Sequence, residues 1–127
     1  MTRFRVSRPA QADLETILAV SRERWEDDGQ ARYSALLEAA FRAIAAKPRG
    51  PTTRERSALL PGIRSFHLRH ARTARAVQDP VHMVFYRIAD DGSIEIIRVL
   101  HERMDPALHL ERAVRRPVRR ATRRRGR

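Results

Sequence analysis

The segment 94–100 constrains the fold more than any other part of the chain. It reads Ile-Glu-Ile-Ile-Arg-Val-Leu, and its apolar residues fall on both faces of a strand, one with Ile94, Ile96 and Leu100 and the other with Ile97 and Val99. A strand that is apolar on both faces lies inside a sheet that is covered above and below. The sequence therefore predicts a central strand over 94–101, interrupted by Arg98 and His101 and followed by a polar Glu-Arg-Met-Asp segment.

Three other segments have the pattern of strands. Residues 4–7 alternate briefly, residues 63–69 alternate between two faces, and residues 82–88 form the strongest strand pattern in the chain. The Asp-Gly pair in 90–93 is a hairpin turn signal because such turns need positive φ angles. Residues 70–80 form a long connection for a hairpin, and the Pro- and Gly-containing segment 48–62 is expected to be a surface loop.

Two helices are predicted between the first and second strands. An apolar stripe runs through 9–26 and ends at Trp25, and a second stripe runs through 30–47 with Tyr33 near its start. The Asp-Asp-Gly segment 27–29 separates them, and Pro48 ends the second helix. A link this short indicates an antiparallel αα-hairpin, and we expect Trp25 to be a core anchor at its open end.

The predicted fold is therefore a two-layer α+β domain with the element order β-α-α-β-β-β. The helical hairpin packs on one face of an antiparallel sheet, whose last three strands form a meander. The domain is expected to span residues 1–110, and residues 111–127 are expected to form a disordered, Arg-rich tail.

Composition excludes several classes of protein. The chain has no cysteine, so disulfides and thiolate metal sites are excluded. It has no apolar stretch near the ~20 residues needed to span a membrane and no secretory signal pattern. We therefore expect a bacterial cytoplasmic protein with no membrane association. The net charge of +12 is concentrated at one end, since nine Arg and one Glu lie in 111–127, and residues 1–110 carry only +4.

The candidate chemical groups do not indicate a catalytic or metal site. The five histidines lack the spacing of zinc ligands, although His67 and His82 would lie side by side if their strands pair. There is no G-x-S-x-G nucleophile motif and no glycine-rich phosphate loop. Four arginines on or beyond two strands could form a basic surface, either as ordinary surface charge or as a docking site for an acidic segment or nucleic acid: Arg64, Arg69, Arg98 and Arg103.

Several short motifs, taken in order, resemble the ParE/RelE toxin superfamily over about residues 4–110. They include Ser-Arg-Pro-Ala-Gln-Ala-Asp-Leu into the first helix, Pro-Gly-Ile-Arg at 61–64, Phe-Tyr-Arg-Ile at 85–88 and Arg-Val-Leu-His at 98–101. The R-V-L-H-x-x-M-D ending is most similar to the ParE branch. The resemblance implies a small bacterial toxin that inhibits DNA gyrase, needs no cofactor and is neutralised by a cognate ParD-like antitoxin.

The RelE branch, whose members are ribosome-dependent endoribonucleases, is the alternative. Cleavage of RNA without a metal needs groups that move protons and stabilise phosphate charge. RelE-like toxins use a Lys/Arg cluster with a Tyr or His, but 104–108 has no Tyr, 52–69 has no Lys, and Asp105 would repel phosphate. We therefore expect no enzymatic activity. A non-toxic binding protein of the same fold is a further alternative.

Two sets of residues are predicted to contact partners. The target-binding candidates lie in the C-terminal stretch and are Arg98, His101, Arg103, Met104 and Asp105. The antitoxin-binding candidates lie on the helical hairpin and the strand 63–69 and are Trp25, Tyr33, Arg64, Phe66 and Leu68. The Arg-rich tail could add contacts to nucleic-acid phosphates.

Overall fold

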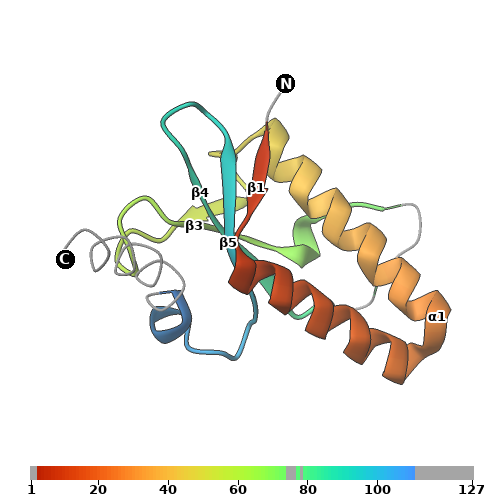
Figure 1. Ribbon diagram of the computed structural model, residues 1–127. Helices are drawn as coiled ribbons and strands as arrows, with labels where there is room; N and C mark the ends of the chain where they lie inside the picture. Colours follow the sequence, from red (N-terminus) through yellow and green to blue (C-terminus); the bar gives the residue numbers. More distant parts are fainter. Residues whose placement is uncertain (1–2, 74–76, 78, 111–127) are drawn as a thin grey trace, which may run out of the picture.

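A helical hairpin and a five-stranded sheet make up the computed structural model, which describes residues 3–73, 77 and 79–110 (Figure 1). The elements follow the order β1 (Phe4–Val6), α1 (Arg8–Ala46), β2 (Thr53–Glu55), β3 (Arg64–His67), a 3-10 turn η1 (Leu68–His70), β4 (His82–Ile88) and β5 (Ile94–His101). The predicted α+β class is confirmed. The predicted tail at 111–127 lies outside the described residues.

The long helix α1 consists of two arms joined at a sharp break. Ser7 caps its start, because its Oγ accepts a hydrogen bond from the Ala10 N–H, and Pro9 lies in the first turn. At Glu26 the backbone leaves the helical region, with φ 62° and ψ −168°, and the chain folds back on itself (Figure 1). The break was predicted at the Asp-Asp-Gly segment 27–29, and it lies one residue before that segment. Gln30 Nε2 donates to the Leu18 carbonyl at 3.0 Å and ties the arms together.

The sheet is mixed, with the strand order β1-β5-β4-β3-β2. All neighbours are antiparallel except β1 and β5, which run parallel. The prediction of an antiparallel sheet is therefore wrong at β1. The predicted order also lacked β2, which lies in the expected loop 48–62 and pairs with β3. The strand β3 is shorter than the predicted 63–69, since Leu68 begins the 3-10 turn.

A β-bulge in β5 changes which side chains share a face. Phe85 pairs with Arg98, but the next residue, Tyr86, pairs with Ile96, so Ile97 is an extra residue in β5. Beyond the bulge the alternation is reversed. Val99 therefore joins Ile94 and Ile96 on the helix side, whereas Leu100 lies with Ile97 on the other side, which corrects the predicted faces.

Both faces of the sheet are covered, as the apolar pattern of β5 requires. The helix-side core combines both arms of α1 with the sheet and includes Ile17, Leu37, Ile44, Phe66, Leu68, Val84, Tyr86 and Val99. The opposite core is smaller and consists of Ile63, Phe85, Ile97, Leu100 and Leu110, with Leu59, Leu60 and Met83 against it. Leu110 reaches this core from a helical turn at 106–110 that Asp105 caps through the Ala107 N–H.

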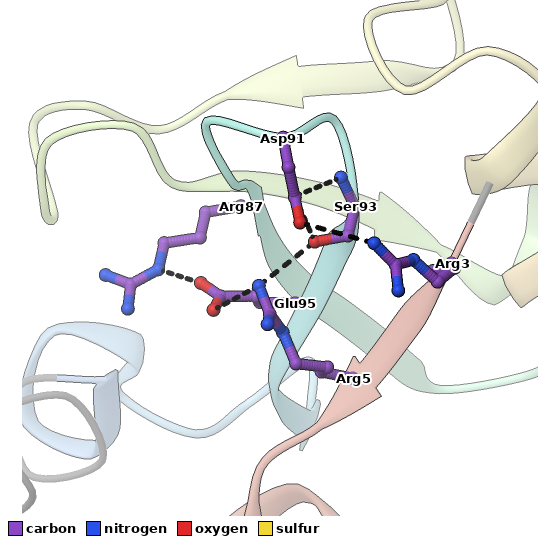
Figure 2. A network of polar contacts seen from close by, with 6 residues as sticks. All are labelled: Arg3, Arg5, Arg87, Asp91, Ser93 and Glu95. Carbon is purple, nitrogen blue, oxygen red and sulfur yellow. Dashed lines mark hydrogen bonds and ion pairs between the residues drawn. The ribbon is translucent and has the colours of Figure 1, made fainter.

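A polar network fixes the register where β1, β5 and the β4–β5 turn meet (Figure 2). Arg5 donates to Ser93 Oγ at 3.0 Å and also pairs with Glu95, which accepts a hydrogen bond from Arg87 at 2.6 Å. Asp91 holds the turn by accepting from the Ser93 N–H and Oγ–H, and these two hydrogen bonds lower the pKa of Asp91. The edge strand β1 is thus joined to β5 and to the β4–β5 turn by side chains as well as by backbone.

No helix among the described residues is long and apolar enough to cross a membrane. The arms of α1 instead bury one side on the sheet and expose charged residues on the other.

Candidate functional site: an apolar groove beside the helical hairpin

An open groove of about 590 Å³ lies between the first arm of α1 and the ends of β4 and β5. Its lining residues include Asp13, Ile17, Val20, Ser21, Arg24, Trp25, Tyr33, Val77, Asp79, Val81, His82, Val99, His101 and Met104. Three of them, Val20, Trp25 and Met104, are large apolar side chains with about half of their surface exposed. Exposed apolar side chains around one hollow are typical of a binding surface. We call this hollow the hairpin groove.

Three aromatic rings, those of Tyr33, His82 and His101, pack together in the hairpin groove. The Tyr33 hydroxyl lies 2.6 Å from His82 Nδ1. The His82 ring packs edge-on against both Tyr33 and His101, with 5.6 Å between centroids in each case. His101 Nδ1 accepts a hydrogen bond from the Arg103 N–H at 3.1 Å. A neutral His101 ring therefore carries its proton on Nε2. A neutral His82 ring carries its proton on Nε2 if the Tyr33 hydroxyl donates to Nδ1, and on Nδ1 if it accepts.

Burial shifts the pKa values of Tyr33 and His82. It raises the pKa of Tyr33 to about 12 and lowers the pKa of His82 to about 4. The nearby His101 also lowers the pKa of His82. At neutral pH Tyr33 is therefore a hydroxyl and His82 a neutral ring, and they share a hydrogen bond between two uncharged groups. This array links the second arm of α1 to β4 and β5 at the groove.

A buried ion pair closes one side of the hairpin groove. Asp13 accepts two hydrogen bonds from the Arg98 guanidinium, both at 2.7 Å, and a third from the Val99 N–H at 2.9 Å. Their side chains are only 13% and 16% exposed. Arg98 also donates to the His109 carbonyl at 3.4 Å. A bidentate pair of this kind fixes both position and orientation.

A second hollow of about 610 Å³ shares Val77, Asp79 and Val81 with the hairpin groove. His67 lines it and is bound at both ring nitrogens, since Nδ1 accepts from the Arg69 N–H at 3.0 Å and Nε2 lies 2.7 Å from Glu102. That hydrogen bond lowers the pKa of Glu102. The strands of His67 and His82 do pair, but the two histidines are not opposite each other, because His67 is opposite Met83, and His82 is opposite His101.

Of the four arginines considered as a possible basic surface, Arg64 and Arg98 do not lie on neighbouring strands. The strand β4 separates β3 from β5, so the strands that carry Arg64 and Arg98 are not adjacent. Arg64 donates to Thr53 Oγ1, and Arg98 is bound to Asp13. The lining of the hairpin groove contains one arginine, Arg24, and two aspartates. Among the described residues, no group of three or more His, Asp or Glu is placed to hold a metal ion.

The structure divides each predicted set of contact residues. Of the target-binding candidates, His101 and Met104 line the hairpin groove, Arg103 and Asp105 are exposed beyond β5, and Arg98 is buried against Asp13. Arg98 thus has a structural partner in Asp13.

The antitoxin-binding candidates are divided in the same way. Trp25 and Tyr33 line the hairpin groove, whereas Phe66 and Leu68 are buried in the helix-side core and present no surface to a partner. Arg64 is partly buried on β3. The expectation that Trp25 is a core anchor is also wrong, because its side chain is 51% exposed.

Sequence reasoning missed the role of Asp13 and the place of Val20 in the hairpin groove. A signal for Asp13 does exist, since an arginine inside a strand that is apolar on both faces needs a buried counter-charge. The sequence does not say which of fifteen acidic residues supplies it.

Comparison with known proteins gives consistent matches over the described fold. A family model for the "ParE toxin of type II toxin-antitoxin system, parDE" matches residues 4–106. The protein "Toxin ParE1" of Mycobacterium tuberculosis (strain ATCC 25618 / H37Rv) is 34% identical over 104 residues, which cover 82% of this chain and 93% of the relative. "Toxin ParE1" of Caulobacter vibrioides (strain ATCC 19089 / CIP 103742 / CB 15) is 34% identical over 110 residues, which cover 87% and 99%.

Removing the buried guanidinium should destabilise the fold. We expect Arg98→Ala to lower the free energy of unfolding by about 3–5 kcal/mol, because it leaves the Asp13 carboxylate buried without its counter-charge. The matched control is Arg87→Ala, which removes a more exposed pair with Glu95 and should lower it by less than about 1 kcal/mol. Urea denaturation of both variants measures the difference. Equal losses would show that the Asp13 pair is an ordinary surface contact.

The His82 ring should make stability depend on pH. Its ordinary pKa of 6.5 applies to the unfolded chain, and burial lowers the pKa in the folded protein to about 4. Between these values the unfolded state binds a proton that the folded state does not, so stability is complete above pH 6.5 and falls as the pH decreases toward 4.

Urea denaturation at about pH 7 and about pH 5 measures this dependence. His82→Gln should lose less stability between the two pH values than the wild-type chain does. An identical loss in both proteins would contradict the assignment to His82.

Proposed function

The chain belongs to the ParE toxin family of type II toxin–antitoxin systems, and on that premise we propose that it inhibits DNA gyrase and is neutralised by a cognate antitoxin. We place its action in the cytoplasm, because the chain would meet both gyrase and its antitoxin there. The family match covers both arms of α1, all five strands and the residues that line the hairpin groove.

The surroundings of His101 favour inhibition through contact over catalysis. A metal-free ribonuclease needs a free cation beside its proton-transfer groups. Here the Arg98 guanidinium is bound to Asp13, and the neighbouring His82 ring is bound to Tyr33 and has a pKa of about 4. The groove lining has two aspartates and one arginine, a charge balance that does not attract phosphate. This observation carries the proposal that the chain is not an enzyme.

The hairpin groove is the surface that we propose for the antitoxin. An amphipathic segment of the antitoxin would place apolar side chains among Val20, Trp25 and Met104 and would bury them. The ring N–H groups of His82 and His101 would donate hydrogen bonds to carbonyl or carboxylate oxygens of that segment. Tyr33 belongs to this surface through its hydrogen bond to His82.

The target surface is proposed to lie beyond the end of β5. Arg103, Met104 and Asp105 are exposed there, on a turn that the Arg103 N–H and the helical segment 106–110 hold in place. The nine arginines of 111–127, outside the described residues, are proposed to add contacts to DNA phosphates in the gyrase complex.

The gyrase proposal is tested by two assays of the purified chain, one with gyrase and a supercoilable plasmid and one with translating ribosomes. We expect loss of supercoiling and intact messenger RNA. Cleaved messenger RNA with normal supercoiling would favour a RelE-like endoribonuclease. Activity in neither assay would identify a non-toxic binding protein of the same fold.

One exposed side chain tests the target surface in the same gyrase assay. Arg103→Ala should weaken gyrase inhibition about tenfold, or about 1.4 kcal/mol, because it removes an exposed charge from the proposed contact surface. Arg54→Ala, on the exposed edge strand β2, is the matched control and should leave inhibition unchanged. Equal effects of the two variants would contradict the placement of the target surface.

A pair of charge substitutions tests the antitoxin surface. Met104 and Leu108 are both 46% exposed, but only Met104 lines the hairpin groove. Met104→Asp should weaken antitoxin binding by about 10- to 100-fold, since docking would bury an unpaired carboxylate.

The matched control is Leu108→Asp, which should leave the affinity unchanged. Titration calorimetry with the purified antitoxin, and growth of cells that co-express both proteins, measure the effect. Equal effects of the two variants would show that the groove is not the docking surface.

A further inference from the structure

Trp25 is the only tryptophan of the chain and lies at the tip of the helical hairpin. Its side chain lines the hairpin groove and is also 51% exposed, so the core does not hold it in place. The Arg24 guanidinium lies 6.0 Å from the centroid of its ring. A large aromatic side chain that is half exposed at the rim of a groove is the type of residue that dominates protein interfaces.

The backbone around Trp25 is unusual in two ways. The next residue, Glu26, has φ 62° and ψ −168°, a combination that is almost restricted to glycine and strained for other residues. Three residues further on, Gly29 is buried directly against Trp25. A Cβ atom added at Gly29 would lie 2.2 Å from the Trp25 Cβ and 3.2 Å from its Cγ.

The contact at Gly29 determines where the indole can be. Rotation about the Cα–Cβ bond of Trp25 leaves its Cβ in place, so a change of rotamer cannot relieve a contact of 2.2 Å. Any side chain at position 29 must therefore displace the backbone of the turn and move Trp25 with it. The absence of a side chain at Gly29 lets the two arms close on each other while Trp25 stays at the rim.

We infer that Trp25 is a specificity-determining contact for the antitoxin, and that Gly29 is the positioning residue that holds it at the groove. This inference rests on the proposed docking of the antitoxin in the hairpin groove. A side chain that the turn has already placed loses less conformational freedom on binding, which favours affinity. Gly29 itself touches no partner and acts only through Trp25.

A double-mutant cycle separates these roles. The full-length chain is prepared as wild type, Trp25→Ala, Gly29→Ala and the double variant, and the Kd of each for the cognate antitoxin is measured. Trp25→Ala should raise Kd by about 30-fold or more, as loss of a dominant interface residue does. Gly29→Ala should raise Kd about tenfold in the wild-type background but leave it unchanged in the Trp25→Ala background.

Fluorescence of the single tryptophan gives a second measurement on the unmodified chain. Antitoxin binding should shift the Trp25 emission to shorter wavelength and protect it from acrylamide. In the free protein, Gly29→Ala should change both emission and quenching. Thermal unfolding of each variant confirms that the folded state is compared, and if Gly29→Ala does not fold, the Trp25→Ala and fluorescence results decide.

Each outcome identifies what has failed. An equal rise in Kd on Gly29→Ala in both backgrounds would overturn the positioning role. Unchanged binding by Trp25→Ala, or unchanged Trp25 fluorescence on binding, would overturn the contact role of Trp25. If Met104→Asp still lost affinity in that case, the proposal that the antitoxin docks in the groove would stand. If neither Trp25→Ala nor Met104→Asp weakens binding, the docking proposal itself has failed.

Discussion

The hydrogen bonds of the Asp13 carboxylate to β5 fix the position of α1 on the sheet. Beyond Ile96, the strand β5 has no neighbour on the β1 side, and its backbone groups there need other partners. The N–H and the Oγ–H of Ser7 donate to the carbonyls of Ile96 and Ile97. Asp13 accepts a hydrogen bond from the Val99 N–H. The same carboxylate neutralises Arg98, so one side chain completes the sheet edge, orients the first arm of α1 and closes the hairpin groove.

Local patterns predicted the elements whose structure is decided locally. The strands β4 and β5, the Asp-Gly turn and the two apolar stripes of α1 all appear near their predicted places. The parallel pairing of β1 and the existence of β2 could not be predicted from local patterns. Both are three-residue strands whose partners, rather than their own residues, define them. The bulge at Ile97 is also invisible in the pattern, because a both-faces apolar strand reads the same in either register.

The candidate site was predicted in parts that the fold then combined or separated. Trp25, Tyr33, His101 and Met104 came from two different predicted surfaces, and the structure brings them to one groove. Phe66 is an apolar residue in an alternating strand, and periodicity alone cannot say that α1 covers its face. Pairs distant in sequence, such as Arg98 with Asp13, are set by strand order, which composition and spacing do not determine.

The pairing of β1 with β5 also has a consequence for biosynthesis. β1 leaves the ribosome about ninety residues before the strand that it joins, and the ion pair between Asp13 and Arg98 spans a similar separation. At about 5–20 residues per second, translation of that interval takes on the order of 10 s. Until β5 emerges, neither the sheet edge nor the wall of the groove can form, so a nascent chain carries both arms of α1 without the strand that supplies Ile94, Ile96 and Val99 to the core beneath them. The order of synthesis therefore delays the native surface until nearly all of the folded region has been made.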